Sequence, residues 1–206
     1  FFDSNSPSRR VGGGVTKLFP SKPHKFPMYS LDNTYSKEEI EQWSARVKKI
    51  LGDKRFLYTC ELKYDGVSVS LRYEKGRFLS GMTRGDGSQG DDITLNLKTI
   101  PSIPLVLRGD FPDSFEVRAE IVLPIKGFEK LNEERKKNGE SPFMNPRNTA
   151  SGSLKLQDSS LVSKRPLECF VYSIIGDQLP FTSQYESLER ASLWGFKVPK
   201  TLFQAN

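Results

Sequence analysis

The stretch VSVSLRYE, from Val67 to Glu74, alternates apolar and polar residues at every second position. Successive side chains of a β-strand point to opposite faces, so a strand with one buried face shows this period of two. The next two residues, Lys75 and Gly76, are typical of a tight turn, and a second strand-like run extends from Arg77 to Thr83. The sequence therefore predicts a β-hairpin.

Further strands and helices are predicted on both sides of this hairpin. A capping box at Ser36, followed by apolar residues at helical spacing, predicts a helix that ends at Gly52. Strands in hairpins, combined with helices but without regular βαβ alternation, indicate the α+β class, with antiparallel sheets flanked by helices. Other strands are expected over 56–62, 115–123 and 167–175, helices over 124–139 and 183–193, and loops over 85–92 and 141–153.

The first 35 residues differ in composition from the rest of the chain. They contain four prolines, a run of three glycines and several Ser and Asn residues, which is typical of a connecting segment. We therefore expect residues 1–35 to form a linker or N-terminal arm, and residues 36–206 to form the core of one domain. The start FFDSNSPSRR lacks both a Met and the pattern of a signal peptide, so we interpret the chain as part of a longer polypeptide.

Composition excludes several classes of protein. The longest uncharged apolar-rich run, from Cys169 to Gly176, is far shorter than the roughly 20 residues of a membrane span. Two cysteines, Cys60 and Cys169, are too few for a disulfide framework, and we expect buried thiols. A single His24 excludes a multi-histidine metal site within the chain. The net charge of +6 suits a polyanionic partner, although an ordinary solvated basic surface explains it as well.

The densest local signal is the run CELKYDG that ends at Gly66. In an extended chain, Glu61, Lys63 and Asp65 project to one face. Such a row of charges is typical of a solvated strand edge that resists aggregation. It also suits a site in which a lysine amine is the nucleophile while the carboxylates bind a ligand or a metal ion. From spacing alone, both interpretations stay open.

Two other segments are rich in small polar residues. The run TRGDGSQGDD, over 83–92, contains the spelling G-x-G-x-x-G. It follows a hairpin strand and no βαβ unit is evident around it, so a dinucleotide-binding fold is disfavoured. It is either a flexible loop or one whose glycines let the backbone approach a ligand while Arg84 contacts a phosphate. The segment 143–155 carries two cations, Arg147 and Lys155, and on its own predicts a loop.

Together these segments resemble the adenylation domain of bacterial NAD-dependent DNA ligases, over nearly the whole chain. The K-x-D-G element alone is shared with ATP-dependent ligases and capping enzymes, whereas six elements in the family's order are far more specific. The resemblance implies the nucleotidyltransferase fold. After SP and RVGG in the arm, the elements are PMYSLDN (27–33), ELKYDG (61–66), TRGDG (83–87), VRAE (117–120), NPRN (145–148) and GSL (152–154).

The resemblance assigns roles around a nucleotide. It implies that Lys63 attacks the α-phosphorus of NAD, forms a bond to AMP and releases nicotinamide mononucleotide. Glu61 is the matched residue that reads the adenine amino group, and Ser30 and Leu31 match further adenine contacts. Tyr172 occupies the position of the aromatic residue that stacks on adenine.

The same comparison assigns residues to the ribose and the phosphates. Glu120 and Arg84 match the ribose-contacting and phosphate-side residues. Asp65 matches the carboxylate beside the nucleophile, engaged with ribose or Mg²⁺, and Gly66 completes that element. Lys155 stands where the family usually has arginine, so a bidentate contact becomes a point charge. Arg147 and Lys155 are implied to face phosphates of the nucleotide or of nicked DNA.

The family's other parts lie outside the chain. The chain ends at Asn206, before the later D-G-V-V-x-K-type element. The domain that grips nicotinamide mononucleotide, the oligonucleotide-binding barrel, the zinc finger, the helix-hairpin-helix domain and the C-terminal domain are also absent from it. We therefore expect a C-terminally truncated core that does not seal nicks by itself, with zinc only in the missing part of the parent enzyme.

The expected function is that of an NAD-dependent DNA ligase. AMP moves to Lys63, then to the 5′-phosphate of nicked double-stranded DNA, and the 3′-hydroxyl displaces it. We expect NAD and Mg²⁺ as cofactors, a monomer, a bacterial cytoplasmic location and no membrane partner; no metal-ligating residue is assigned. Two alternatives stay open: an ATP-dependent ligase or capping-type enzyme, and a non-catalytic nucleic-acid-binding module of the same fold. The segments 30–33 and 145–154 argue against the first, and the intact residues around Lys63 against the second.

Overall fold

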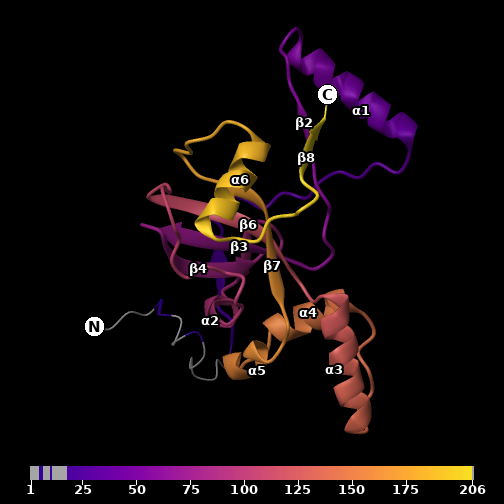
Figure 1. Cartoon of the computed structure of the whole chain (residues 1–206), viewed down its shortest axis with the longest axis vertical. Coiled ribbons are helices and arrows are strands. Elements are labelled where there is room, and N and C mark those ends of the chain that lie inside the picture. Colours follow the sequence, from indigo (N-terminus) through magenta and orange to yellow (C-terminus); the bar gives the residue numbers. More distant parts are fainter. Residues whose placement is uncertain (1–4, 7–9, 11–17, 206) are drawn as a thin grey trace.

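A computed structural model describes residues 5–6, 10 and 18–205 of the chain (Figure 1). At its centre is an antiparallel sheet with the strand order β4-β3-β6-β7. The predicted hairpin forms with the expected bounds, and Lys75 at its turn has the positive φ of 48° that such turns require. The four strands are β3 (Val67–Glu74), β4 (Arg77–Thr83), β6 (Ser114–Val122) and β7 (Glu168–Ile175).

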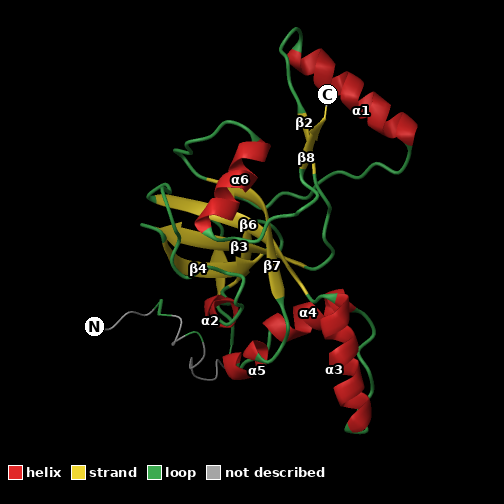
Figure 2. Cartoon of the chain, viewed as in Figure 1, coloured by secondary structure: helices red, strands yellow, loops and turns green. Residues whose placement is uncertain are grey.

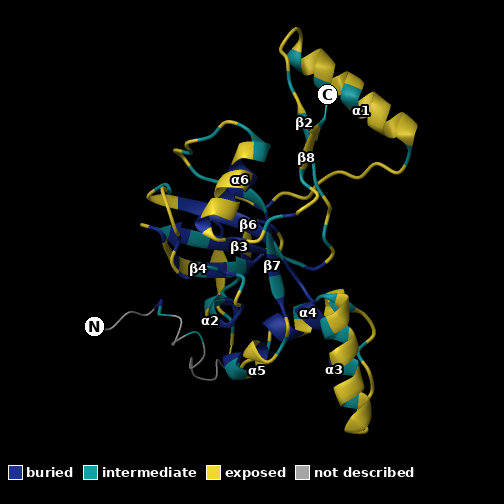
Figure 3. Ribbon diagram, in the orientation of Figure 1, coloured by how far each residue is buried: buried dark blue, intermediate teal, exposed yellow. Residues whose placement is uncertain are grey.

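The two faces of this sheet differ in polarity. Val69, Leu71 and Tyr73 of β3 are fully buried on one face, as the period of two predicts. Helices α2 (Thr94–Lys98) and α6 (Gln184–Trp194) contribute to the same hydrophobic core (Figures 2 and 3). The opposite face carries polar and charged side chains of β3, β6 and β7, namely Ser68, Ser70, Glu116, Arg118, Glu120 and Tyr172.

Two short ribbons accompany the central sheet within residues 18–205. Strand β1 (Ser21–Pro23) pairs with β5 (Gln89–Asp91), and β2 (Tyr58–Cys60) pairs with β8 (Phe203–Ala205). The strand predicted over 56–62 is therefore shorter, and the predicted loop 85–92 contains a strand. Strand β1 belongs to the predicted arm 1–35, of which only residues 5–6, 10 and 18–35 are described; the boundary at residue 36 stays a prediction.

Helix α1 (Lys37–Leu51) forms as predicted but is not packed into the core. The Ser36 side chain accepts a hydrogen bond from the Glu39 N–H, and the Glu39 carboxylate accepts one from the Tyr35 N–H. No residue of α1 is buried, and its apolar residue Trp43 is 43% exposed. In Figure 3 the helix lies apart from the central sheet, beside the β2–β8 ribbon.

The prediction of a loop over 141–153 is wrong, because helix α4 (Pro146–Leu154) lies there. The Asn145 side chain accepts a hydrogen bond from the Asn148 N–H (2.8 Å), and Pro146 occupies the first turn, where a missing N–H costs nothing. Burial of one face of this polar helix outweighs its loop-like composition. Helices α3 (Ile125–Lys137) and α5 (Ser159–Ser163) flank it. None of the described helices combines the length and apolarity that crossing a membrane requires.

Candidate active site

The polar face of the central sheet gathers side chains from three neighbouring strands. Ser68 of β3 is paired with Glu120 of β6, which is in turn paired with Phe170 of β7. A β-bulge in β7 leaves Tyr172 without a partner on β6. The Tyr172 hydroxyl lies 2.7 Å from the Ser68 hydroxyl, so the tyrosine extends across β6 towards β3. Two predicted site residues, Glu120 and Tyr172, are thus on one face.

The connection from β2 to β3 is held against this face at two points. The Gly66 N–H donates a hydrogen bond to Glu120 Oε1 (3.0 Å). The Tyr64 ring is stacked on Phe170, with 4.4 Å between ring centroids and 15° between planes. Lys63, the predicted nucleophile, is exposed immediately before these two anchored residues. Tyr64 was not singled out from the sequence, where it is only the variable residue of K-x-D-G.

The expected row of charges does not form as an extended strand. Strand β2 ends at Cys60, and the residues after it form an irregular connection. Glu61 is half-buried there, whereas Lys63 and Asp65 are exposed. The interpretation as a plain solvated strand edge therefore does not describe Glu61. Cys60 is partly exposed and Cys169 is buried, and both are free thiols.

The Glu120 carboxylate lies at the centre of a cluster of charges. Burial raises its pKa above the usual value, while the Gly66 N–H and the charges of Lys63 and Arg147 oppose that rise. The charge of Asp65 raises the pKa further. Arg147 Nη1 lies 2.9 Å from Asp65 Oδ1, and both side chains of this ion pair are largely exposed. The structure thus brings together Lys63, Asp65, Glu120 and Arg147, which we call the Lys63 cluster.

Two of the residues assigned to adenine, Glu61 and Tyr172, are joined by a residue that sequence reasoning missed. Gln184 Nε2 donates hydrogen bonds to Glu61 Oε1 (2.9 Å) and to the Tyr172 carbonyl oxygen (2.6 Å). Burial raises the pKa of Glu61, and the hydrogen bond from Gln184 opposes that shift. Burial also raises the pKa of Tyr172. No local pattern marks Gln184, which is only one residue of the predicted last helix and the first residue of α6 in the structure.

The glycine-rich segment after β4 forms a loop closed by backbone hydrogen bonds. The Gly87 N–H donates to the Arg84 carbonyl oxygen (3.0 Å), and the Met28 N–H donates to the Gly87 carbonyl oxygen (2.8 Å). This contact brings the arm alongside the loop. Arg84 Nη1 lies 3.5 Å from the Ser30 hydroxyl, a long hydrogen bond. Ser30 and Arg84 are therefore neighbours, whereas Leu31 is 74% exposed.

The two predicted phosphate-binding cations lie at opposite ends of α4. Arg147 is in the first turn and belongs to the Lys63 cluster. Lys155 follows the last residue of the helix, and its Nζ lies 2.9 Å from Asp91 Oδ2 on β5. Eight residues of helix separate the two Cα positions by about 12 Å. Of these two cations, Arg147 therefore belongs to the Lys63 cluster, whereas Lys155 is paired with Asp91.

A buried ion pair lies on the polar face and was also missed. Arg118 and Glu116 are 3% and 2% exposed, and their charged atoms are 3.1 Å apart. The Ser70 hydroxyl donates to the same Glu116 oxygen (2.8 Å), and Arg118 donates to the Phe26 carbonyl oxygen. The pair therefore ties the arm to the sheet. The alternation of VRAE places Arg118 on the face of Glu120, which is the signal that could have found it.

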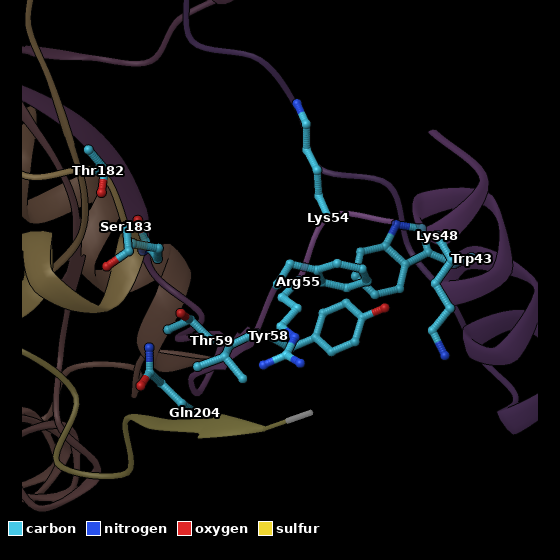
Figure 4. Close-up of a pocket in the computed structure, with 12 residues that line it drawn as sticks. Trp43, Lys48, Lys54, Arg55, Tyr58, Thr59, Thr182, Ser183 and Gln204 are labelled. Atoms are coloured by element: carbon cyan, nitrogen blue, oxygen red, sulfur yellow. The ribbon is translucent and has the colours of Figure 1, made fainter. Parts of the chain in front are cut away.

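An open groove of about 1120 Å³ adjoins Gln184 on the side of α1 (Figure 4). Trp43, Lys48 and Arg55 line it together with Tyr58 of β2. Lys63 is not among its lining residues, so the groove is distinct from the Lys63 cluster. Among the described residues, no group of three or more His, Cys, Asp or Glu side chains is placed to hold a metal ion.

The fold and this site define an α+β domain in which an exposed lysine lies among carboxylates and an arginine on a polar sheet face. The family model of the NAD-dependent DNA ligase adenylation domain matches residues 16–206, and the chain belongs to this family. It is 59% identical over 200 residues to a DNA ligase of Flavobacterium psychrophilum and 60% identical over 199 residues to one of Christiangramia forsetii. Each alignment covers 97% of this chain and 30% of the relative, so the chain spans about a third of those proteins.

Proposed function

We propose that this chain is the core of an adenylation domain with the nucleotidyltransferase fold, in which Lys63 forms a covalent bond to AMP taken from NAD. The observation that carries the proposal is the Lys63 cluster, where the charges of Lys63 and Arg147 act on the carboxyl of Glu120 and Arg147 is paired with Asp65. The family match supports the same function across the chain, and it favours NAD over ATP as the AMP donor.

In the proposed step, Lys63 Nζ attacks the α-phosphorus of NAD. A P–N bond forms, the P–O bond to nicotinamide mononucleotide breaks, and the amine releases a proton to solvent. Placed positive charge is the main stabiliser of such phosphoryl transfers. Arg84 and Arg147 are proposed to supply that charge next to the nucleophile. Lys155 is proposed to act from the far end of α4, as a point charge on a phosphate of the nucleotide or of DNA.

Glu61, Tyr172, Ser30 and Leu31 are proposed to bind the adenine. A flat aromatic surface and a carboxylate that accepts from the exocyclic amine are the groups that an adenine site needs. Glu61 Oε2 is buried and has no hydrogen-bond partner among the described residues, which fits a carboxylate oxygen that a ligand amine completes. Chemistry and geometry therefore support the adenine assignment for Glu61.

Glu120, Asp65 and Gly66 are proposed to form the ribose side of the site. Glu120 is half-buried and keeps one carboxylate oxygen on the Gly66 N–H, so its other oxygen is the one available to a ribose hydroxyl. Asp65 is exposed and paired with Arg147, so a ribose hydroxyl or Mg²⁺ would compete with that arginine. Mg²⁺ itself stays a prediction.

Nick sealing is proposed for the longer protein that such a domain serves. There AMP passes from Lys63 to the 5′-phosphate of nicked DNA, and the 3′-hydroxyl then displaces it. The net charge of +6 is compatible with a DNA partner. The monomeric state and the cytoplasmic location stay predictions. The family match does not support the two alternatives, an ATP-dependent enzyme and a non-catalytic nucleic-acid-binding module.

Intact-mass measurement of the 206-residue chain after incubation with NAD and Mg²⁺ tests the proposal. Under conditions in which the wild type and Lys126→Ala, an exposed control on α3, gain one AMP, we expect no gain in Lys63→Ala. An adduct that survives in Lys63→Ala would contradict the assignment of the nucleophile. An adduct formed from ATP and not from NAD would favour the ATP-dependent alternative. Salt-sensitive DNA binding that is unaffected by Lys63→Ala, without any adduct or nucleotide binding, would favour the binding module.

A further inference from the structure

Gln184 lies where three segments of the molecule meet. It is the first residue of α6, directly after Ser183, whose side chain caps the helix by accepting from the Glu186 N–H. Its amide nitrogen donates to Glu61 after β2 and to the backbone of Tyr172 on β7. One side chain therefore connects α6, the start of the connection that carries Lys63, and the central sheet.

The orientation of the Gln184 amide is determined by its partners. A carboxylate oxygen and a backbone carbonyl oxygen only accept hydrogen bonds, so both must face the NH₂ group. The two N–H bonds of that group are thereby used, at 2.9 Å and 2.6 Å. The Gln184 side chain has no freedom to rotate without losing both bonds, which makes it a rigid link between Glu61 and Tyr172.

This link leaves the two oxygens of Glu61 in different situations. Oε1 accepts from Gln184, whereas Oε2 is buried and has no hydrogen-bond partner among the described residues. A ligand that brings a hydrogen-bond donor satisfies such an oxygen. A ligand without the donor leaves the oxygen buried and unpaired, which weakens its binding. Burial by itself favours the protonated carboxyl, and the Gln184 hydrogen bond opposes that by stabilising the carboxylate.

We infer that Gln184 is a positioning residue that sets base specificity: it orients Glu61 relative to Tyr172 so that Oε2 accepts a hydrogen bond from the exocyclic amine of a purine stacked on the tyrosine. The inference rests on the proposed nucleotide site and adds the residue that makes it selective for the 6-amino group. Gln184 itself touches neither the base nor the phosphates. Without its amide, the carboxylate is free to rotate or to become protonated, and then Oε2 no longer presents an acceptor at a fixed position.

The test compares two nucleotides on the 206-residue chain by calorimetry: AMP and purine riboside 5′-monophosphate, which lacks only the 6-amino group. Gln184→Met keeps the length of the side chain and removes both hydrogen bonds. Gln42→Met makes the same change at an exposed position on α1 and serves as the control. We expect the wild type and Gln42→Met to bind AMP about tenfold more tightly than the analogue. In Gln184→Met the preference should fall to about twofold, mainly through weaker binding of AMP.

The possible failures are distinguishable. If the wild type binds AMP with a preference and Gln184→Met keeps it, the role of Gln184 is overturned while the nucleotide site stands. Equal binding of both nucleotides to the wild type would overturn the proposal that Glu61 accepts a hydrogen bond from the 6-amino group, and with it the role of Gln184. Absence of AMP binding to the wild type would overturn the proposed site in this chain together with this inference.

A second readout separates positioning from general damage to the fold. Titration of the Glu61 side-chain carbon by NMR should give a higher pKa in Gln184→Met than in the wild type, because a hydrogen bond that stabilises the carboxylate is lost. Gln42→Met should titrate at Glu61 as the wild type does. A Glu61 titration unchanged in a folded Gln184→Met would overturn the inference without any nucleotide being present.

Discussion

Gly66 ties the proposed nucleophile to the central sheet. Its N–H donates to Glu120, and the backbone passes so close to β6 that an added β-carbon would lie 2.2 Å from the Ile121 carbonyl oxygen. That distance is shorter than any non-bonded contact, so only a residue without a side chain permits this approach. The approach also brings the end of the connection that carries Lys63 to Glu120. Gly66 thus determines how closely the segment that carries Lys63 approaches the Glu120 carboxylate.

Replacing Gly66 by alanine should destabilise the domain. The new methyl group would press on the backbone of Ile121, which has little freedom inside β6, and such overpacking costs about 1–3 kcal/mol. Urea unfolding followed by circular dichroism measures the effect. Gly152→Ala is the matched control, because no atom lies within 4 Å of a β-carbon there and alanine favours the helix by up to about 1 kcal/mol. Equal stability of Gly66→Ala and the wild type would contradict the close approach.

Glu120 should make stability depend on pH. Burial raises its folded-state pKa above the usual 4.5, so the folded state binds this proton more tightly than the unfolded state. Ionisation of Glu120 therefore costs stability as the pH rises from the unfolded value through the folded one. Relative to the wild type, Glu120→Gln should gain stability across that window and keep a constant advantage above it.

Urea midpoints from about pH 4 to about pH 8 check the Glu120 prediction, since an unperturbed glutamate titrates near the lower end of this range. Glu133→Gln, at an exposed position on α3, is the control for a change of net charge alone. A stability difference between Glu120→Gln and the wild type that does not change with pH would show that the ionisation of Glu120 is not linked to folding.

At the scale of elements, α1 and α6 have the same kind of cap but different surroundings. Ser36 and Ser183 each accept a hydrogen bond from the N–H three residues later. Helix α6 buries Leu188 and Trp194 in the core, whereas α1 buries no residue. Helix stability in proteins comes mostly from such packing, so the two helices should differ in how strongly they are coupled to the rest of the fold.

Removing each cap should reveal this difference. Ser183→Ala should lower the free energy of unfolding of the domain by about 1 kcal/mol, the usual value of a serine cap. Ser36→Ala should lower the free energy of local opening of α1, measured by hydrogen exchange, by a comparable amount. It should leave the global urea midpoint unchanged. Amide exchange followed by NMR, together with urea unfolding, distinguishes the two. An equal global loss in both variants would mean that α1 unfolds with the core.

Elements whose pattern is local were predictable, and elements that depend on distant partners were not. Strands β3 and β4 have the predicted bounds because alternation and the Lys75–Gly76 turn are readable within a few residues. Strands β1 and β5 have three residues each and exist because residues about 70 positions apart pair with each other. Helix α4 has a loop-like composition, and burial of Ala150 and Leu154 outweighs it.

For the whole molecule, the position of the candidate site follows from the arrangement of the central sheet and the β2–β8 ribbon. The connection that carries Lys63 runs from the β2–β8 ribbon to the central sheet (Figure 1). Glu61 at its start is joined to α6 through Gln184, and Gly66 at its end is joined to β6 through Glu120. The segment that carries the proposed nucleophile is therefore attached to α6 at its start and to β6 at its end. Small changes in the relative position of these two elements would move Lys63.

The sequence by itself determined the hairpin, the capped helix α1, the family resemblance and the residues proposed for chemistry, because periodicity, caps and motifs are properties of neighbouring residues. Only the tertiary structure decided which of those residues meet. It places Arg147 in the Lys63 cluster and Lys155 on Asp91, and it brings Gln184 to Glu61 from 123 positions away. Contacts over such separations depend on how the sheets and helices pack, and no local pattern in the chain encodes them.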